Sequence, residues 1–301
     1  MNVGWMPSRV FGAPGADLRR VAALADDAGV DHLAVGDHVS FFVGAGGDGL
    51  GYATAMLALS DRLSVNTGVY LLPLRHPTTV ARQLSDMAAL APGRFVFGVG
   101  IGGEDPHEVE ICGVDPSTRG RRMNECIQVV RGLLTGEPFD FDGEFFALSR
   151  AYVLPAPADP IPIVVGGRSD AAVRRAGRLG DGWFGVWVSA RRYREVVDEM
   201  HAHAAEAGRD GVQWRNVLNV WCGVDDSRES AREHLAPAMH AFYQLPFERF
   251  EKWSPYGTAE DLAGFLAPYA EAGCHDVNMI INGPDLEAEA EAVAEVRRLL
   301  S

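Results

Sequence analysis

Short apolar runs alternate with longer amphipathic segments along this chain. Residues 94–99 (RFVFGV), 163–165 (IVV) and 217–224 (VLNVWCGV) are mostly apolar, as expected of strands buried on both faces of a parallel sheet. The segment after Ser169 instead repeats its apolar positions at helical spacing, for example at Ala172, Ala176 and Leu179. This alternation predicts repeated strand–helix units.

The pattern predicts eight strands, at residues 2–6, 32–35, 63–71, 94–99, 163–165, 182–186, 217–224 and 276–281. Helices are expected between them, at 16–28, 52–60, 77–90, 118–134, 170–179, 190–207, within 230–250, and at 259–272 and 286–300. Eight such units in 301 residues are typical of a closed (β/α)8 TIM barrel, an α/β fold that forms one domain over residues 1–301. An open doubly wound sheet is the alternative, but Gly98, Gly100 and Gly102 lack the Rossmann spacing.

One segment interrupts the alternation between the fourth and fifth units. Residues 136–160 are rich in aromatic residues and prolines. We expect this insertion to form a hairpin or an extended excursion that covers one side of the barrel.

Composition and charge exclude several classes of function. The formal net charge of −14 argues against a general nucleic-acid or anionic-membrane binder, because both need a broad basic face. No apolar run is long enough to span a bilayer and no signal segment begins the chain, so we expect a soluble, cytoplasmic protein. The four cysteines are far apart and form no CxxC pair, so no metal site and no disulfide framework is expected.

The turn after the fifth strand is a candidate anion site. Gly166-Gly167 permits a sharp turn, and Ser169 is a good N-cap for the helix that follows. An anion placed there would meet backbone N–H groups and the guanidinium of Arg168. Three more arginines follow within the next ten residues, a local reversal of charge in an acidic chain: Arg174, Arg175 and Arg178. The alternative is an ordinary tight strand-to-helix turn.

Candidate catalytic residues follow the second and fourth strands. In a TIM barrel the chemistry belongs to the carboxyl ends of the strands. His38 can donate or accept a proton at neutral pH, and Asp37 can orient it or bind a cofactor. The alternative is that Asp37 caps a turn while His38 packs beneath it. Glu104 is a second acid–base candidate, although Glu108 could fill that place, or the carboxylate could simply be solvated.

Aromatic residues near strand ends are candidates for an apolar substrate pocket. From a larger set that includes Phe42, Trp183 and Trp221, we select Trp5, Phe41 and Trp187 as lining residues. Aromatic residues at strand ends more often belong to the core, so only a minority should meet substrate.

Five motifs together carry a family resemblance. They are DH at 37–38, TGVYLLPLRHP at 67–77, RFVFGVGIGG at 94–103, RGRRMNECIQVVRGLLTGEPFDFDGEFF at 119–146 and VVGGRSDAAVRRAGRLGDGWF at 164–184. Over nearly its whole length the chain resembles the luciferase-like monooxygenase superfamily, and most closely the branch that uses the deazaflavin coenzyme F420.

The resemblance implies a flavin-like ring across the barrel mouth with its phosphate near the fifth strand. Gly167, Arg168 and Ser169 would then hold the phosphate, in agreement with the anion site above. Gly68 and Val69 would support the ring, and Gly100 and Gly166 would be further cofactor-binding residues. In this superfamily a non-proline cis peptide often occurs at the position of Gly68-Val69, and an ordinary strand end is the alternative.

Three functions remain open. The first is an F420-dependent oxidoreductase that moves a hydride between the coenzyme and a small organic substrate, with His38 as proton partner. The second is a two-component monooxygenase that uses FMN, since flavin activates oxygen readily and deazaflavin does not. The third is a non-catalytic flavin-binding protein. Because Lys252 is the only lysine, we expect a neutral or hydrophobic substrate. The resemblance also implies a homodimer formed through the barrel helices.

Overall fold

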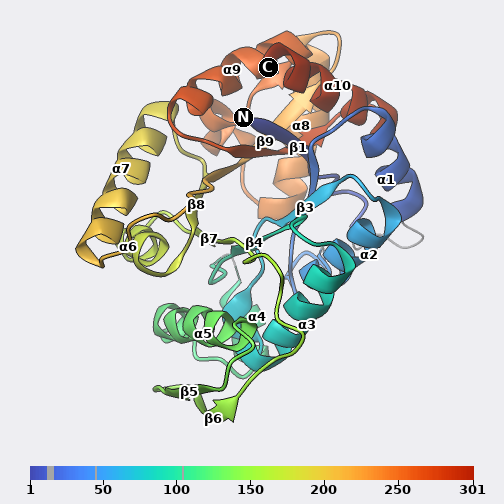
Figure 1. Cartoon of the computed structure of the whole chain (residues 1–301). Helices are drawn as coiled ribbons and strands as arrows, with labels where there is room; N and C mark the ends of the chain where they lie inside the picture. Colours follow the sequence, from blue (N-terminus) through green and yellow to red (C-terminus); the bar gives the residue numbers. More distant parts are fainter. Residues whose placement is uncertain (12–16, 45, 104) are drawn as a thin grey trace.

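A closed barrel of eight parallel strands forms the centre of the molecule (Figure 1). The computed structural model describes residues 1–11, 17–44, 46–103 and 105–301. The barrel strands are β1 (Asn2–Trp5), β2 (His32–Val35), β3 (Ser64–Thr67), β4 (Phe95–Val99), β7 (Ile163–Gly166), β8 (Gly182–Val186), β9 (Val217–Val224) and β11 (Asp276–Asn282). Pairing of β8 with β9 and of β11 with β1 closes the ring. The predicted TIM barrel is confirmed.

Helices surround the strands and cover their outer face (Figure 1). They are α1 (Leu18–Asp27), α2 (Gly49–Leu59), α3 (Pro77–Leu90), α5 (Arg119–Leu134), α6 (Asp170–Leu179), α7 (Ala190–Glu206), α8 (Arg228–Tyr243), α9 (Ala259–Glu271) and α10 (Leu286–Leu299). Side-chain oxygens of Ser169, Ser189 and Thr258 accept hydrogen bonds from the first turns of α6, α7 and α9. Local capping therefore fixes where these helices begin. None of the described helices is long and apolar enough to cross a membrane.

The barrel interior carries a buried polar chain. Asn219 Nδ2 donates to the Gly68 carbonyl at 2.9 Å, and Asn278 Nδ2 donates to Asn219 Oδ1 at 3.0 Å. Below them, His32 Nε2 lies 2.7 Å from Asn278 Oδ1. The His32 ring occupies the space that a side chain at Gly4 would need, since a Cβ there would lie 2.1 Å from Nε2. These contacts tie β1, β2, β9 and β11 together inside the ring.

The third strand is shorter than the apolar pattern predicts. It ends at Thr67 instead of continuing to residue 71, because the chain leaves the sheet at Gly68-Val69, whose peptide bond is cis. Tyr70 returns to the sheet in one isolated bridge with Val99. A short 3-10 helix, η1 (Leu72–Leu74), then leads into α3.

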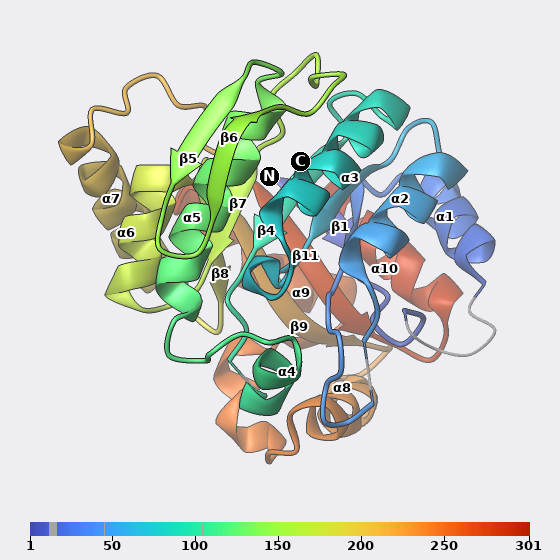
Figure 2. The ribbon, with the colours of Figure 1, turned by 90° about the horizontal axis from the view of Figure 1, so that it is seen from below.

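The insertion at 136–160 contains the expected hairpin. Its strands are β5 (Phe139–Asp142) and β6 (Ala147–Ala151), paired antiparallel. Figure 2 shows the hairpin lying across the outer side of α5. The Glu125 carboxylate of α5 accepts hydrogen bonds from the backbone N–H groups of Glu144 and Phe145, at 2.7 and 2.9 Å. The insertion is thus fixed to the helix that precedes it.

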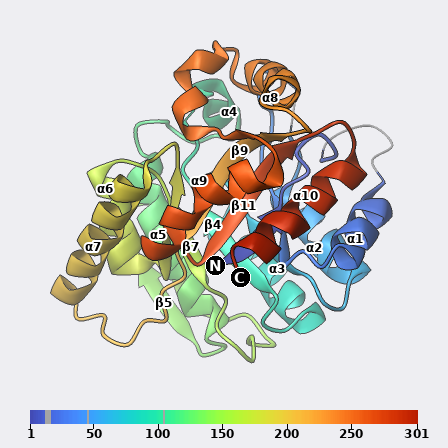
Figure 3. The same cartoon turned by 90° about the horizontal axis from the view of Figure 1, so that it is seen from above.

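Additional short elements lie at one end of the molecule, together with α8. Figures 2 and 3 both place α4 (Pro106–Ile111) and α8 at the end of the barrel away from the two termini. Two 3-10 helices, η2 (Phe247–Arg249) and η3 (Glu251–Trp253), follow α8, and the two-residue strand β10 (Tyr256–Gly257) adds to β9. The sequence pattern does not predict α4. Its start signals, Asp105 as N-cap and Pro106 in the first turn, are nevertheless present.

Candidate active site

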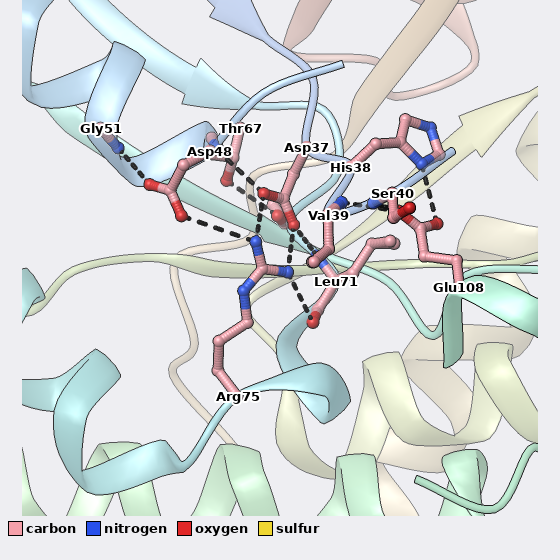
Figure 4. Close-up of polar contacts among 12 residues, drawn as sticks. Asp37, His38, Val39, Ser40, Asp48, Gly51, Thr67, Leu71, Arg75 and Glu108 are labelled. Atoms are coloured by element: carbon pink, nitrogen blue, oxygen red, sulfur yellow. Dashed lines mark hydrogen bonds and ion pairs between the residues drawn. The ribbon is translucent and has the colours of Figure 1, made fainter. Parts of the chain in front are cut away.

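His38 and Glu108 form an ion-pair contact at the carboxyl end of β2. His38 Nδ1 lies 3.0 Å from Glu108 Oε2 (Figure 4). The other carboxylate oxygen, Oε1, accepts hydrogen bonds from the backbone N–H groups of Val39 and Ser40, at 2.6 and 3.0 Å. Because a carboxylate only accepts hydrogen bonds, His38 donates one to Glu108 through Nδ1. Its other ring nitrogen, Nε2, makes no hydrogen bond with the described residues. Glu108 is 2% exposed, so it is held in place as part of the protein interior.

Aromatic rings cover the imidazole of His38. The Phe41 ring stacks on it with centroids 4.0 Å apart and planes 23° apart. Phe242 of α8 contacts both rings, at 5.9 Å from His38 and 5.1 Å from Phe41. His38 is therefore partly desolvated, with 16% of its side-chain surface still exposed. The contribution of Phe242 was not expected from the sequence, because nothing local indicates that the end of α8 reaches the second strand.

Asp37 anchors the backbone from which His38 extends. Its Oδ1 accepts hydrogen bonds from the Gly49 N–H at 2.9 Å and from Arg75 Nη2 at 2.7 Å. Its Oδ2 accepts from the Leu71 N–H at 2.8 Å and from Arg75 Nη1 at 2.6 Å (Figure 4). Burial raises the pKa of Asp37, and the Arg75 guanidinium opposes that rise. These contacts match the alternative in which Asp37 caps neighbouring backbone, and direct contact with a cofactor stays a prediction.

The side chain of Val69 lies between two glycines at the barrel mouth. A Cβ at Gly100 would lie 2.4 Å from Val69 Cγ2, and one at Gly166 would lie 3.1 Å from Val69 Cγ1. Because neither glycine has a side chain, the Val69 side chain fits between them. The structure brings Gly68, Val69, Gly100 and Gly166 together from three different strand ends, although the sequence places them almost 100 residues apart.

The turn at the end of β7 has the predicted form. Gly167 adopts φ +131°, and its carbonyl accepts a hydrogen bond from the Trp183 indole at 2.7 Å. Ser169 Oγ accepts from the Ala172 N–H at 3.3 Å and so caps α6. The guanidinium of Arg168 lies over the Trp187 ring, 5.4 Å from its centre, and has no ion pair among the described residues. The charge reversal is smaller than expected, because Arg175 is buried and donates to Asn124 and the Gly120 carbonyl.

Comparison with known proteins assigns the chain to a family. The model of the family described as luciferase-like monooxygenase matches residues 2–297. The chain belongs to this family. The resemblance inferred from the five motifs is thereby confirmed.

Two curated relatives are similar in sequence to this luciferase-like chain. An uncharacterised protein of Mycobacterium tuberculosis is 47% identical over 166 residues, which is 55% of this chain and 57% of the relative, so the match spans little more than half of that protein. The F420-dependent glucose-6-phosphate dehydrogenase of Nakamurella multipartita is 33% identical over 226 residues, 72% of this chain and 66% of the relative.

Two solved structures share the family's barrel. An F420-dependent secondary alcohol dehydrogenase in complex with an F420-acetone adduct has a TM-score of 0.87 at 22% identity, with both chains covered completely. The oxygenating constituent of 3,6-diketocamphane monooxygenase from Pseudomonas putida, in complex with FMN, has a TM-score of 0.77 at 15% identity over 100% of this chain and 99% of the other. At these identities the likeness concerns the fold alone.

One predicted site residue lies outside the mouth of this luciferase-like barrel. Trp5 is fully buried in the core between strands and helices, beside Glu289 of α10. Side chains alternate along a strand, so Val3 and Trp5 share the outer face while Gly4 faces inward against His32. The prediction that Trp5 lines the substrate pocket is therefore wrong.

The other two predicted lining residues lie at the mouth, and the second acid–base candidate is not described. Phe41 stacks on His38, and Trp187 lines two cavities of about 620 and 430 Å³. Glu104 lies outside the described residues. Glu108, the alternative to it, is the carboxylate that contacts His38. No group of side chains that could hold a metal ion occurs among the residues that the structure describes.

Proposed function

We propose that this chain is an F420-dependent oxidoreductase that transfers a hydride between the coenzyme and a small organic substrate. The observation that carries the proposal is the His38–Glu108 contact, which holds the imidazole just after β2 and leaves its Nε2 without a hydrogen bond to the described residues. The relatives named as F420-dependent dehydrogenases support the choice of cofactor.

The residues at the mouth fit such a cofactor. Gly166 and Gly167 leave a turn without side chains in front of α6, and Arg168 adds a cation that no described carboxylate neutralises. These residues, with Ser169, would hold the phosphate group. Val69, seated between Gly100 and Gly166, would support the ring, and the Asn219 side chain fixes the Gly68 carbonyl from below. When bound, the deazaflavin accepts or supplies the hydride.

His38 accepts the proton when the substrate is oxidised and donates it when the substrate is reduced. Oxidation of an alcohol releases a hydride from carbon and a proton from oxygen, and reduction of a carbonyl consumes both. We assign that proton to Nε2 of His38, because Nδ1 is held by Glu108. The Glu108 carboxylate keeps the ring oriented and offsets the positive charge that the imidazole gains. Asp37 and Arg75 keep the loop that carries His38 in place.

A fluorescence titration tests the cofactor assignment. The purified protein is titrated with coenzyme F420, with oxidised FMN and with reduced FMN, and so is the double variant Arg168→Ala, Ser169→Ala. Arg178→Ala, an exposed arginine in the last turn of α6, is the matched control. We expect F420 to bind tightly, the double variant to lose most of this affinity, and the control to retain it.

Other outcomes identify the alternatives. A preference for reduced FMN would favour the two-component monooxygenase, whose fold is shared by the FMN complex described above. Turnover that survives replacement of His38 would refute the assigned proton transfer. Binding of neither cofactor would refute the cofactor assignment altogether. The homodimer implied by the family stays a prediction that the molar mass in solution can test.

A further inference from the structure

Two adjoining cavities open beside the end of β8. The larger, of about 620 Å³, lies between Trp187, the start of α7, α9 and η3. The smaller, of about 430 Å³, extends from Phe42 to η2 and η3. Arg168, Trp187 and Trp253 line both, so the cavities are continuous with the β7 turn on one side and with the Phe41–Phe42 segment near His38 on the other.

Four cationic side chains line these cavities, and three of them have no ion pair with a described residue. Arg168, Arg192 and Lys252 line the larger cavity, and Arg168 and Arg249 line the smaller. No described carboxylate or carboxamide side chain lines either one. Arg192 pairs with Glu195 and Glu199 at 3.4 and 3.7 Å, while Arg168, Arg249 and Lys252 have no ion pair among the described residues. The only lysine of a chain with a net charge of −14 therefore stands at this site.

Aromatic rings form much of the remaining wall. Trp187 packs against Tyr243 and Phe250, each with ring centroids 5.0 Å apart. The Lys252 ammonium lies 3.9 Å from the centre of the Trp253 ring, so it projects along an apolar surface. A ligand here would meet flat apolar walls and positive charge, a combination suited to an amphipathic anion.

The side chains that line the cavities carry more hydrogen-bond donors than acceptors, which favours carboxylates and phosphates over polyhydroxylated ligands. Guanidinium, ammonium and indole groups donate and do not accept. Ser189 Oγ and the Tyr243 hydroxyl each accept one hydrogen bond, from the Arg192 N–H and the Trp221 indole, and the Tyr269 hydroxyl donates to the Val188 carbonyl. A hydroxyl oxygen can accept two hydrogen bonds, so the lining side chains offer a few acceptors against a larger number of donors. A polyhydroxylated ligand would bring more hydroxyl protons than these side chains can accept, at roughly 1–3 kcal/mol for each buried group left unsatisfied. Carboxylates and phosphates accept only and suit this lining.

We infer that the substrate has an apolar, preferably planar body and one carboxylate or phosphate group. The anionic group binds at Lys252, and the apolar body lies against Trp187 and Trp253. This inference rests on the proposed function and names its substrate class. It revises the expectation of a neutral substrate, which followed from the scarcity of lysines, and it sets this chain apart from relatives named for a sugar phosphate.

Paired dyes test the inference without knowledge of the natural substrate. The probes are 8-anilinonaphthalene-1-sulfonate, an aromatic anion, and N-phenyl-1-naphthylamine, which has the same rings without the sulfonate. Both are titrated into the full chain by fluorescence, with and without saturating coenzyme F420. The variant is Lys252→Met, which keeps the length of the side chain. Arg191→Met removes an equal charge from a side chain that is 84% exposed and lines neither cavity.

We expect the sulfonate to bind more tightly than the amine, and Lys252→Met to weaken only the sulfonate, about tenfold, as the loss of one charge-assisted contact predicts. Arg191→Met should change neither. Equal binding of the two dyes, sulfonate binding that does not depend on Lys252, or tighter competition by glucose 6-phosphate than by benzoate would overturn the inference. So would displacement of the sulfonate by F420, which would assign the cavity to the cofactor.

Titrations of the same protein samples distinguish failure of the proposed function from failure of the proposed substrate class. Coenzyme F420 binding is measured by its own fluorescence in samples that contain no dye. A protein that fails to bind F420 but binds the sulfonate through Lys252 would refute the proposed function and retain the anion site. A protein that binds F420 while Lys252→Met leaves both dyes unaffected would retain the function and refute the substrate class.

Discussion

His38 Nδ1 and Glu108 Oε2 lie 3.0 Å apart although 70 residues separate them in the sequence. The same carboxylate binds the backbone N–H groups of Val39 and Ser40, so α4 is attached both to the imidazole and to the loop that carries it. Glu108 thus positions His38 and supplies a negative charge beside it. Its effect on turnover should be larger than its effect on cofactor binding.

Replacing Glu108 tests this positioning role. In Glu108→Gln the side chain keeps its shape but loses the charge that offsets a protonated imidazole. We expect kcat to fall roughly tenfold or more, against about a hundredfold for His38→Ala, with the Kd for coenzyme F420 nearly unchanged. The pH profile of kcat should change shape in Glu108→Gln. Glu110→Gln, the same substitution on an exposed residue of α4, is the control. A normal kcat and pH profile in Glu108→Gln would refute the role.

The Asp37–Arg75 pair should dominate the stability of this end of the barrel. Arg75→Met leaves a buried carboxylate with two backbone donors but no cation. Removing one partner of a buried pair costs about 3–5 kcal/mol. We expect a loss of this size in the free energy of unfolding measured in urea. Arg191→Met, which breaks an exposed pair with Glu195, should change it by roughly 0.5 kcal/mol or less. Equal losses in the two variants would contradict the assignment.

A methyl group at Gly100 should displace Val69. The Cβ of Gly100→Ala would lie 2.4 Å from Val69 Cγ2, and Gly166 closes the other side. Overpacking of this kind costs about 1–3 kcal/mol, and the displaced valine should also weaken F420 binding. Gly103→Ala meets nothing within 4 Å and serves as the control. The double variant Gly100→Ala, Val69→Ala should recover part of the lost stability, and failure to do so would show that Val69 is not the obstacle.

The sequence predicts the barrel well because each of its signals is local. The apolar runs, the N-cap Ser169 and the glycine turn at 166–167 each act over a few residues, and all of them are present in the structure. The third strand is an exception. Its apolar residues continue past Thr67, which predicts a longer strand, but there the chain leaves the sheet.

The site is harder to predict because its contacts join distant segments. His38 could be identified from its place after the second strand, but its partner Glu108 depends on how α4 docks. The prediction for Trp5 is wrong because strands buried on both faces are apolar at every position. Their sequence therefore does not show which side chains face the inside of the barrel and which face the helices. Arg175 likewise sits among other arginines in sequence but points to Asn124 of α5.

Glu289 provides a test at a different part of the fold. Its side chain is fully buried on α10, where it pairs with Arg9 and accepts a hydrogen bond from the Gly283 N–H at 3.1 Å. Burial raises its pKa from the ordinary value of 4.5 to about 7, and Arg9 opposes the rise. The folded state therefore holds a proton between pH 4.5 and 7 that the unfolded state releases.

The sign of the pH dependence follows from this raised pKa. Stability that Glu289 contributes is fully present below about pH 4.5 and is lost as the pH rises through about 7. Glu289→Gln is neutral at every pH and keeps an oxygen for the Gly283 N–H. Between pH 5 and 8 the wild-type free energy of unfolding should fall by about 2–3 kcal/mol relative to this variant. Glu291→Gln, exposed on the same helix, should track the wild type. A wild-type minus Glu289→Gln difference that stays constant over this range would mean that Glu289 remains ionised throughout, with Arg9 compensating its burial.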